Sequence, residues 1–241
     1  MNKVQIRGID ILAAPNQQTL IEYLLGNGNE IKKGKLIAIN AEKIIISESN
    51  PIIRDILHNA EYNYADGISI VLSIKKKYPE YADIERVAGA DLWVGLMEKA
   101  SQFNTPVFLV GAQAVTLAQT NEKLVQMGVN IVGTQDGYFY KEKEDEIIQR
   151  IAQSGAKLIT VALGSPKQEL FIQKAQAIYS DALYMGVGGT YDVFIGKVKR
   201  APKFWQNLGL EWLYRLLSQP TRWKRQVRLV KYACYYWLNR L

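Results

Sequence analysis

Short apolar runs alternate along this chain with amphipathic stretches of helical length, and this pattern restricts the fold more than any other feature. Runs such as Tyr62–Ala65 and Leu158–Leu163 have the length of strands that are buried on both faces. Strands that alternate with helices favour βα units around a parallel sheet. We therefore predict an α/β fold, with a Rossmann-like, mostly parallel sheet and helices on both of its faces.

The same pattern predicts where the elements lie. We expect strands at Lys35–Asn40, Tyr62–Ala65, Val107–Val110, Asn130–Gly133, Leu158–Leu163 and Ala182–Val187. We expect helices at Gln17–Leu25, Pro51–Asn59, Gly89–Gln102, Val115–Met127, Lys143–Ser154 and Pro166–Tyr179. Pro51 and Pro166 suit first-turn helix positions, where the missing backbone N–H costs nothing.

Each expected strand runs into a small or polar residue. These strand ends are Asn40, Asp66–Gly67, Gly111, Asp136–Gly137, Gly164–Ser165 and Gly188–Gly189. In open α/β sheets the ligand lies beyond the carboxyl ends of the strands, so six segments are expected to converge on one site. The alternative for each position is that glycine and aspartate simply end strands, as they often do.

The turn GVGGTYD, from Gly186 to Asp192, is a candidate phosphate-binding turn. Glycines let the backbone approach phosphate oxygens, and N–H groups at a helix start favour anions. A dinucleotide fingerprint needs an early βα position and an acid roughly 20 residues further on. This turn comes late in the chain and a basic segment follows it, so NAD is disfavoured and a nucleotide diphosphate is left open.

No residues typical of a metal site stand out. The sequence has no Asp-x-Asp pair, and its single histidine, His58, falls in an expected helix and is interpreted as structural. The single cysteine, Cys234, excludes an internal disulfide framework and a cysteine metal cage. We therefore expect no metal and no other cofactor. Arginine is the natural substitute for neutralising a diphosphate, because its planar group grips phosphate at two points.

Positive charge is concentrated near the C-terminus. Residues 197–241 hold 11 lysines and arginines and one acid, Glu211, whereas residues 1–196 hold 19 basic and 22 acidic residues. A mildly acidic body with a strongly basic end is typical of an appendage that meets an anionic surface or ligand. We predict a catalytic domain at residues 1–196 and a helical, membrane-associating appendage at residues 197–241.

Within the appendage, apolar residues recur at alternating steps of four and three, which predicts one stripe along a helix. The stripe is formed by Trp223, Val227, Val230, Cys234, Trp237 and Leu241, and basic residues lie on a neighbouring face. Tyrosines at 232, 235 and 236 are of the ring type that settles at lipid headgroups. This pattern favours a helix that lies on an anionic membrane surface. The alternatives are a helix packed on the core with a solvated basic side, and nucleic-acid binding, which the acidic body disfavours.

The N-terminal residues MNKVQIRGIDILAAP have no apolar segment of signal-peptide length followed by a cleavage site. No window approaches the roughly 18 consecutive apolar residues of a spanning helix. We therefore expect a cytoplasmic protein, bound peripherally to the inner face of the cell membrane.

Eight motifs in the chain resemble, in the same order, those of the WecG/TagA/CpsF glycosyltransferases. They are AINAEK (Ala38–Lys43), YADGISIV (Tyr64–Val71), RVAGADLW (Arg86–Trp93), VFLVGA (Val107–Ala112), QDGYF (Gln135–Phe139), GSPKQE (Gly164–Glu169), GVGGTYDVFIGKVKRAPK (Gly186–Lys203) and GLEWLYRLLSQPTR (Gly209–Arg222). The resemblance runs from about residue 5 to the end of the chain. The variants AINAEK and YADGIS resemble the branch that uses a uronate donor, whereas the teichoic-acid branch usually carries Thr where Ala38 stands.

The resemblance implies a UDP-sugar-dependent, inverting and metal-independent hexosyltransferase. It would move N-acetyl-D-mannosaminuronic acid from UDP to undecaprenyl-diphosphate-linked GlcNAc, a step of enterobacterial common antigen synthesis. The implied partners are thus a UDP-sugar donor, a lipid-linked acceptor and an anionic membrane surface, with no nucleic acid. The alternatives are a teichoic-acid-type transferase that uses UDP-N-acetylmannosamine, another nucleotide-binding α/β enzyme, and a basic module without catalysis.

The resemblance also implies roles for individual residues. Asp66 matches the family's catalytic base, which removes the proton of the acceptor hydroxyl; its structural alternative is to cap the next helix. Other residues match or flank substrate-binding positions: Asn40, Arg86, Gln168, Gly111, Asp136, Tyr138, Gly188, Gly189, Asp192, Arg215, Arg222 and Arg225. Tyr138 is interpreted either as a ring that stacks on uracil or as a core tyrosine. The three appendage arginines are expected to reach a diphosphate once the appendage meets the membrane, or else to be solvated. Lys43 is a hypothetical partner for the donor's carboxylate.

Overall fold

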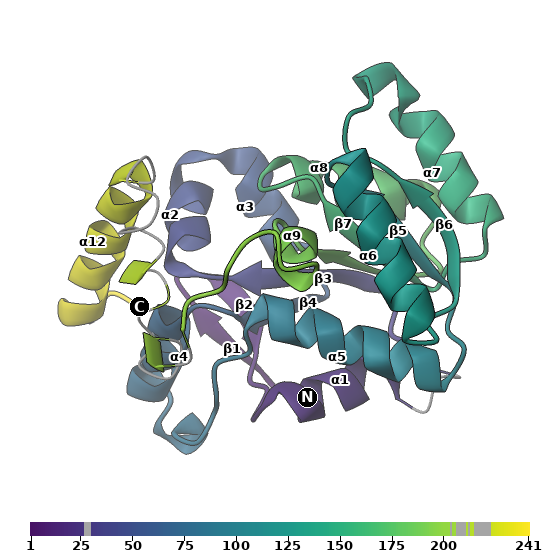
Figure 1. Ribbon diagram of the computed structural model, residues 1–241. Coiled ribbons are helices and arrows are strands. Elements are labelled where there is room, and N and C mark those ends of the chain that lie inside the picture. Colours follow the sequence, from purple (N-terminus) through teal and green to yellow (C-terminus); the bar gives the residue numbers. More distant parts are fainter. Residues whose placement is uncertain (27–29, 203, 206–210, 212, 215–222) are drawn as a thin grey trace.

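The computed structural model describes residues 1–26, 30–202, 204–205, 211, 213–214 and 223–241. Eight strands form one sheet in the order β1-β2-β4-β3-β8-β7-β5-β6, in which only the β1–β2 pair is antiparallel (Figure 1). The strands are β1 (Lys3–Ile6), β2 (Ile9–Leu12), β3 (Gly34–Ile39), β4 (Tyr62–Ala65), β5 (Val107–Gly111), β6 (Ile131–Gln135), β7 (Leu158–Ala162) and β8 (Leu183–Gly186). The predicted α/β class with a mostly parallel sheet is confirmed.

Ten α-helices are described. They are α1 (Gln17–Leu25), α2 (Ala41–Ser49), α3 (Pro51–His58), α4 (Ile68–Lys77), α5 (Gly89–Gln102), α6 (Ala114–Gln126), α7 (Glu144–Gln153), α8 (Lys167–Ile178), α9 (Thr190–Phe194) and α12 (Trp223–Trp237). Short 3-10 helices at Pro79–Tyr81 and Lys141–Lys143 complete the set.

The helices lie on both faces of the sheet because successive strand residues point to opposite sides. On β3, Leu36 packs in a core with helices α1, α5 and α6, whereas Ile37 packs in a second core with α2, α3 and α4. On β7, Leu158 belongs to the first core and Ile159 to a third core with α7 and α8. Because both faces of the central strands are buried, these strands appear in the sequence as mostly apolar runs.

Every strand and helix predicted between residues 17 and 187 is present, with ends shifted by at most two residues. Helix α8 begins at Lys167, so Pro166 precedes it as the N-cap residue, whereas Pro51 does occupy the first turn of α3. The prediction did not include the β1–β2 hairpin or the helices α2, α4 and α9.

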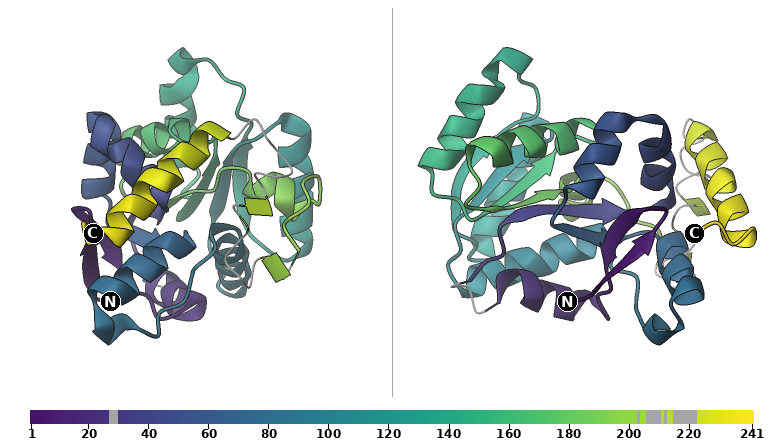
Figure 2. Two further views of the ribbon diagram at one scale, coloured as in Figure 1. Left: turned by 90° about the vertical axis from the view of Figure 1, so that its left-hand side faces the viewer. Right: turned by 180° about the vertical axis from the view of Figure 1, so that it is seen from behind.

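Helix α12 packs beside α2 and α4 at the end of the sheet that carries β1 (Figure 2). Tyr232 is buried there and its hydroxyl lies 2.8 Å from Ser73 Oγ on α4. Arg228 pairs with Glu42 over 2.8 Å, and Lys231 pairs with Glu48 over the same distance. The packed side of α12 thus carries aromatic and basic residues, and the basic residues form ion pairs with acids on α2.

Of the predicted apolar stripe, Leu241 is half-buried against the second core, whereas four other residues face solvent. Val227, Val230, Cys234 and Trp237 are all exposed. The alternative of a helix packed on the core with a solvated basic side agrees with the buried Tyr232, but Arg228 and Lys231 on the basic side pair with Glu42 and Glu48. No helix in the described part of the chain is long and apolar enough to cross a membrane.

Candidate active site

Asn40 and Asp66 lie side by side because strands β3 and β4 pair in parallel register. Ile39 is opposite Ala65, and each polar residue directly follows its strand. The N–H groups of Asp66 and Gly67 both donate to the carbonyl oxygen of Ile39, each over 3.1 Å. A Cβ added to Gly67 would lie 3.0 Å from Asn40 Cβ, so the glycine permits this close approach. The register thus brings two of the predicted site residues together.

The Asp66 carboxylate is held at the start of helix α5. Its Oδ1 accepts a hydrogen bond of 2.8 Å from the N–H of Gly89, the first residue of that helix. Asp66 does not cap the next helix, α4, whose N-cap is Gly67 with no side-chain bond; its carboxylate binds the first N–H of α5 instead.

Arg86, another residue expected at the site, lies against Asp66. Its Nε donates to the Asp66 carbonyl oxygen over 2.6 Å, and its Nη2 lies 3.0 Å from Glu211 Oε2. Glu211 is buried and its Oε1 is also 3.8 Å from Arg200 Nε. Arg200 in turn makes a two-point ion pair with Asp91 on α5, with 2.8 Å between Nη2 and Oδ2. This bond to Asp91 raises the pKa of Arg200, although burial opposes it.

The residues Asp91, Arg200 and Glu211 were not predicted as part of the site. Together with Arg86 they form a chain of opposite charges that ends beside Asp66. Glu211 is the sole acid among the basic residues 197–241, and that isolation was the one available signal. Its partners lie 125 and 11 positions away in sequence, too irregular a spacing for a local motif.

Gln168 connects the glycine turn to helix α8. Its Oε1 accepts a hydrogen bond of 2.9 Å from the N–H of Gly188, and its Nε2 donates to Glu169 Oε1 over 3.2 Å. Glu169 Oε1 also accepts a hydrogen bond of 2.9 Å from Lys43 Nζ. Lys43 is therefore buried against a carboxylate of the protein itself, and its role toward a donor carboxylate stays a hypothesis.

Asp192 lies on the short helix α9 and faces the start of helix α6. Its Oδ1 accepts from Thr116 Oγ1 over 3.2 Å and lies 3.3 Å from Lys197 Nζ. Lys197 also donates to Gln113 Oε1 over 2.9 Å. The glycine turn, with Gly188 and Gly189, thus leads into a polar group formed by α6 and α9.

Comparison with known protein families matches residues 4–241 to the glycosyl transferase WecG/TagA/CpsF family. The chain belongs to the WecG/TagA/CpsF family. Because the match covers nearly the whole chain, it extends over both the sheet and the C-terminal helix. The protein is therefore a glycosyltransferase, which requires a sugar donor and an acceptor.

Three residues expected at a WecG/TagA/CpsF substrate site end or follow strands β5 and β6, toward the sheet edge that is farther from Asp66. Gly111 ends β5, and Asp136 follows β6, which is the edge strand. Five strand spacings separate β4 from β6, which is roughly 24 Å at the usual spacing. Tyr138 is 76% exposed, so its interpretation as a core tyrosine is wrong. Asp136 Oδ1 accepts from the Tyr138 N–H over 2.9 Å and shapes the turn after β6.

The three appendage arginines expected from the family are not placed. Arg215 and Arg222 lie outside the described residues, and Arg225 is described only as part of the backbone of α12. Among the described residues, no three His, Cys, Asp or Glu side chains are grouped as a metal site would require. His58 is the last residue of helix α3 and is exposed.

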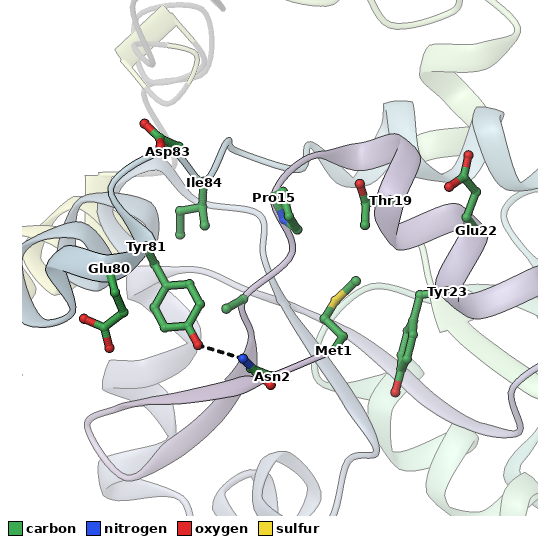
Figure 3. Close-up of a pocket in the computed structure, with 11 residues that line it drawn as sticks. Met1, Asn2, Pro15, Thr19, Glu22, Tyr23, Glu80, Tyr81, Asp83 and Ile84 are labelled. Atoms are coloured by element: carbon green, nitrogen blue, oxygen red, sulfur yellow. Dashed lines mark hydrogen bonds between the residues drawn. The ribbon is translucent and has the colours of Figure 1, made fainter.

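A cavity whose lining does not include Asp66 opens beside strand β2. It has a volume of about 620 Å³ and lies where β2 ends, between helix α1 and the 3-10 helix at Pro79–Tyr81 (Figure 3). Its lining includes Glu22, Glu80 and Asp83 and no lysine or arginine. An acidic lining disfavours a diphosphate, so this cavity does not suit the UDP group.

Proposed function

We propose that this protein is an inverting, metal-independent transferase that moves N-acetyl-D-mannosaminuronic acid from UDP to undecaprenyl-diphosphate-linked GlcNAc. The observation that carries this proposal is the position of Asp66. Its carboxylate lies at the carboxyl edge of the sheet, where α/β proteins bind ligands, with Oδ1 held by Gly89. Among the described residues, none donates a hydrogen bond to Oδ2. That oxygen is the group we assign as the general base.

In the proposed reaction, Asp66 Oδ2 takes the proton of the acceptor hydroxyl. At the same time, the oxygen of that hydroxyl attacks the anomeric carbon of the donor. The bond from that carbon to the UDP oxygen breaks on the opposite face, so the configuration inverts. A carboxylate within hydrogen-bond reach of the attacking hydroxyl typically contributes about 10²- to 10⁴-fold to the rate. Asn40, beside Asp66, is proposed to bind a hydroxyl or the acetamido group of the sugar.

The donor's carboxylate is assigned to Arg86. This guanidinium already holds a carboxylate, that of Glu211, over 3.0 Å and lies against Asp66. Arginine suits this role because its planar group binds carboxylates at two points. A donor carboxylate would bind the Arg86 guanidinium either together with the Glu211 carboxylate or in its place.

The leaving UDP is assigned to the turn at Gly188 and Gly189, with Asp192 near the ribose or uracil. Backbone N–H groups in a glycine turn before a helix favour phosphate. We further propose that Arg215, Arg222 and Arg225 neutralise the diphosphate in place of a metal. They would form part of a lid that closes when residues 197–241 meet the membrane.

Membrane association is assigned to helix α12 as an appendage to the catalytic domain at residues 1–196. Its exposed residues Val227, Val230 and Trp237 form a solvent-facing apolar stripe on a basic helix. Such a helix binds at the boundary of headgroups and acyl chains, and anionic lipid strengthens the binding. This arrangement would bring a cytoplasmic enzyme to its lipid-linked acceptor.

A transfer assay tests the proposal. It combines a soluble analogue of the GlcNAc-diphosphate-lipid acceptor with UDP-N-acetylmannosaminuronic acid or UDP-N-acetylmannosamine, with and without EDTA. We expect uronate transfer that EDTA does not reduce and that falls at least about 10²-fold in Asp66→Asn. Asp10→Asn is the matched control, because Asp10 lies on β2 and its carboxylate contacts only Gln5 in the described structure.

Each other outcome has a defined meaning. Transfer of the neutral sugar alone would overturn the donor assignment and favour a teichoic-acid-type transferase. Full activity in Asp66→Asn would overturn the assignment of the base. Loss of transfer with EDTA that Mg²⁺ or Mn²⁺ restores would overturn metal independence.

A further inference from the structure

A buried ion pair joins the helices that follow β3 and β7. Lys43 on α2 and Glu169 on α8 are 2.9 Å apart between Nζ and Oε1, and their side chains are only 10% and 2% exposed. Burial raises the pKa of Glu169, but the charge and hydrogen bond of Lys43 outweigh this, so the net pKa is lowered. The Glu169 carboxylate thus keeps a lowered pKa in a place where both side chains have lost most of their contact with water.

A buried ion pair is weak evidence for stability. Removing two charges from water is costly, and apolar residues of similar volume often serve a fold as well or better. In the described structure, neither the Lys43 nor the Glu169 side chain hydrogen-bonds to Asp66. The position of this pair calls for a role other than holding the sheet and helices together.

The Lys43–Glu169 pair is connected by hydrogen bonds to the glycine turn on one side and to Asn40 on the other. Glu169 Oε1 accepts from Gln168 Nε2 over 3.2 Å, which leaves Gln168 Oε1 turned toward the N–H of Gly188 over 2.9 Å. An amide can present its oxygen to one partner only when its nitrogen faces another, so Glu169 fixes which way Gln168 points. Gln168 is itself buried.

The hydrogen bonds on the other side of the pair reach the start of α2. The N–H of Lys43 donates to Asn40 Oδ1 over 2.9 Å, so the residue that pairs with Glu169 also orients Asn40. The turn at Gly188 and the side chain of Asn40 are thus linked through Lys43, Glu169 and Gln168. These two ends are the positions assigned above to the diphosphate and to the sugar.

We propose that Lys43 and Glu169 are positioning residues that orient Gln168, and through it the Gly188 turn, for binding of the UDP group. This inference rests on the proposed function, because it takes the turn as the site of the nucleotide. Neither residue touches substrate in this assignment. Their effect should therefore appear mainly in nucleotide affinity and in KM for the donor, and less in kcat.

The test is UDP binding measured by calorimetry, with donor KM and kcat from the transfer assay. The variant Lys43→Met with Glu169→Met removes both charges and the acceptor for Gln168 Nε2. We expect it to unfold at a temperature no lower than the wild type but to bind UDP at least about tenfold more weakly. The variant Lys43→Met with Glu169→Gln removes the charges but keeps an acceptor oxygen, and we expect it to bind UDP within about threefold of the wild type.

A second ion pair provides a matched control at the opposite end of the same strand and helix. Lys35, at the start of β3, is buried and lies 3.4 Å from Glu61, and both contact Gln176 on α8. Replacing Lys35 and Glu61 by Met should leave UDP affinity unchanged. In addition, Gln168→Ala should weaken UDP binding, and the Met pair at 43 and 169 should then cause little further loss, because the pair acts through Gln168.

The outcomes separate this inference from the proposed function. If the wild type binds UDP and transfers sugar, but the Met pair at 43 and 169 binds UDP equally well, the positioning role is wrong and the function stands. If replacing Lys35 and Glu61 by Met weakened UDP binding equally, the positioning role would also be overturned, because the loss would then be a general effect of burying methionines. If the wild type neither binds UDP nor transfers sugar, both the function and the inference fail. Should the Met pair not fold, unchanged UDP affinity in Gln168→Ala would still refute the role.

Discussion

Arg86 donates its Nε–H to the backbone carbonyl oxygen of Asp66 over 2.6 Å, so its guanidinium is fixed against the proposed base. The same side chain reaches Glu211 with Nη2. The planar fork of arginine makes both contacts at once, and a lysine ammonium on a flexible stem does not reproduce this geometry. The position of positive charge beside Asp66 thus depends on the residue type and not only on its charge.

We expect Arg86→Lys to lower kcat/KM for the uronate donor by roughly 10- to 100-fold, the equivalent of one or two hydrogen bonds to charged groups. The measurement is steady-state transfer with both donors. Arg54→Lys is the control, since Arg54 also donates to backbone carbonyl oxygens, but to those of Ser47 and Glu48 on helix α2 and not to that of Asp66. An equal loss in both variants would point to a general effect of arginine replacement.

A methyl group at Gly186 should disturb the glycine turn. A Cβ added there would lie 2.6 Å from Gln168 Nε2, so the buried amide would have to move. We expect Gly186→Ala to lower the free energy of unfolding by about 1–3 kcal/mol, as overpacking usually does, and to weaken UDP binding. Urea unfolding measures the first effect and calorimetry the second.

Gly189→Ala is the control for unfolding, because nothing lies within 4 Å of its added Cβ and its φ of −83° suits any residue. Its free energy of unfolding should stay within about 0.5 kcal/mol of the wild type. A stable Gly186→Ala protein with normal UDP affinity would show that Gln168 need not remain where it lies.

The contact between Tyr232 and Ser73 should give the docking of α12 a dependence on alkaline pH. Burial raises the pKa of Tyr232 to about 12, although the Ser73 hydrogen bond and the charge of Arg7 oppose it. An unfolded tyrosine ionises near pH 10, so between about pH 10 and 12 the unfolded state has lost a proton that the folded state keeps. The stability contributed by Tyr232 is therefore complete below pH 10 and is lost as the pH rises toward 12.

Tyr232→Phe should be less stable than the wild type by about 0.5–1.5 kcal/mol at pH 7, through the lost hydrogen bond. Above pH 10 this difference should shrink and change sign, because phenylalanine does not titrate. Urea unfolding at stepped pH measures it, with Tyr140→Phe as the control at an 82% exposed position. A difference that stays constant up to pH 12 would contradict the raised pKa.

The exposed stripe of α12 predicts binding to anionic vesicles. Val230 is 65% exposed, and full burial of a valine side chain contributes roughly 1.5–3 kcal/mol. We expect Val230→Asp to weaken binding to phosphatidylglycerol-containing vesicles by at least about tenfold, measured by co-sedimentation. Val115→Asp, at a 69% exposed position on α6, should bind as the wild type does. Equal binding by all three proteins would exclude this stripe as the contact.

The central sheet could be predicted because its signal is local. Strand β4 and helices α1 and α5 were predicted to the residue, since β4 is a mostly apolar run and the helices have clear periodicity. The β1–β2 hairpin was missed because its antiparallel strands, KVQI and IDIL, alternate polar with apolar residues, whereas the prediction followed apolar runs. Its turn uses Arg7 with a φ of 50°, a conformation that arginine seldom adopts.

The site could be predicted only in part. Asp66, Asn40 and Gln168 follow strands, and the carboxyl-edge rule applies to them directly. Glu211 and Arg200 join the site through contacts between segments distant in sequence, which no local pattern encodes. The direction of the α12 stripe was also beyond prediction, because periodicity identifies the apolar side but not which side meets the body. Tyr232 decides that by packing against Ser73.

The parallel register of β3 and β4 has a consequence for how such an enzyme can diverge. Ile39 is paired with Ala65, so the spacing of Asn40 and Asp66 depends on main-chain pairing and not on the loops that follow. Insertions near Asn50, between α2 and α3, would lengthen the crossover without changing that spacing. A slip of β4 by one residue would move Tyr64 out of the core and Asp66 out of reach of Gly89 at once. New acceptors or donors can therefore be acquired by altering the surrounding segments, whereas the two reactive positions can change only together with the core.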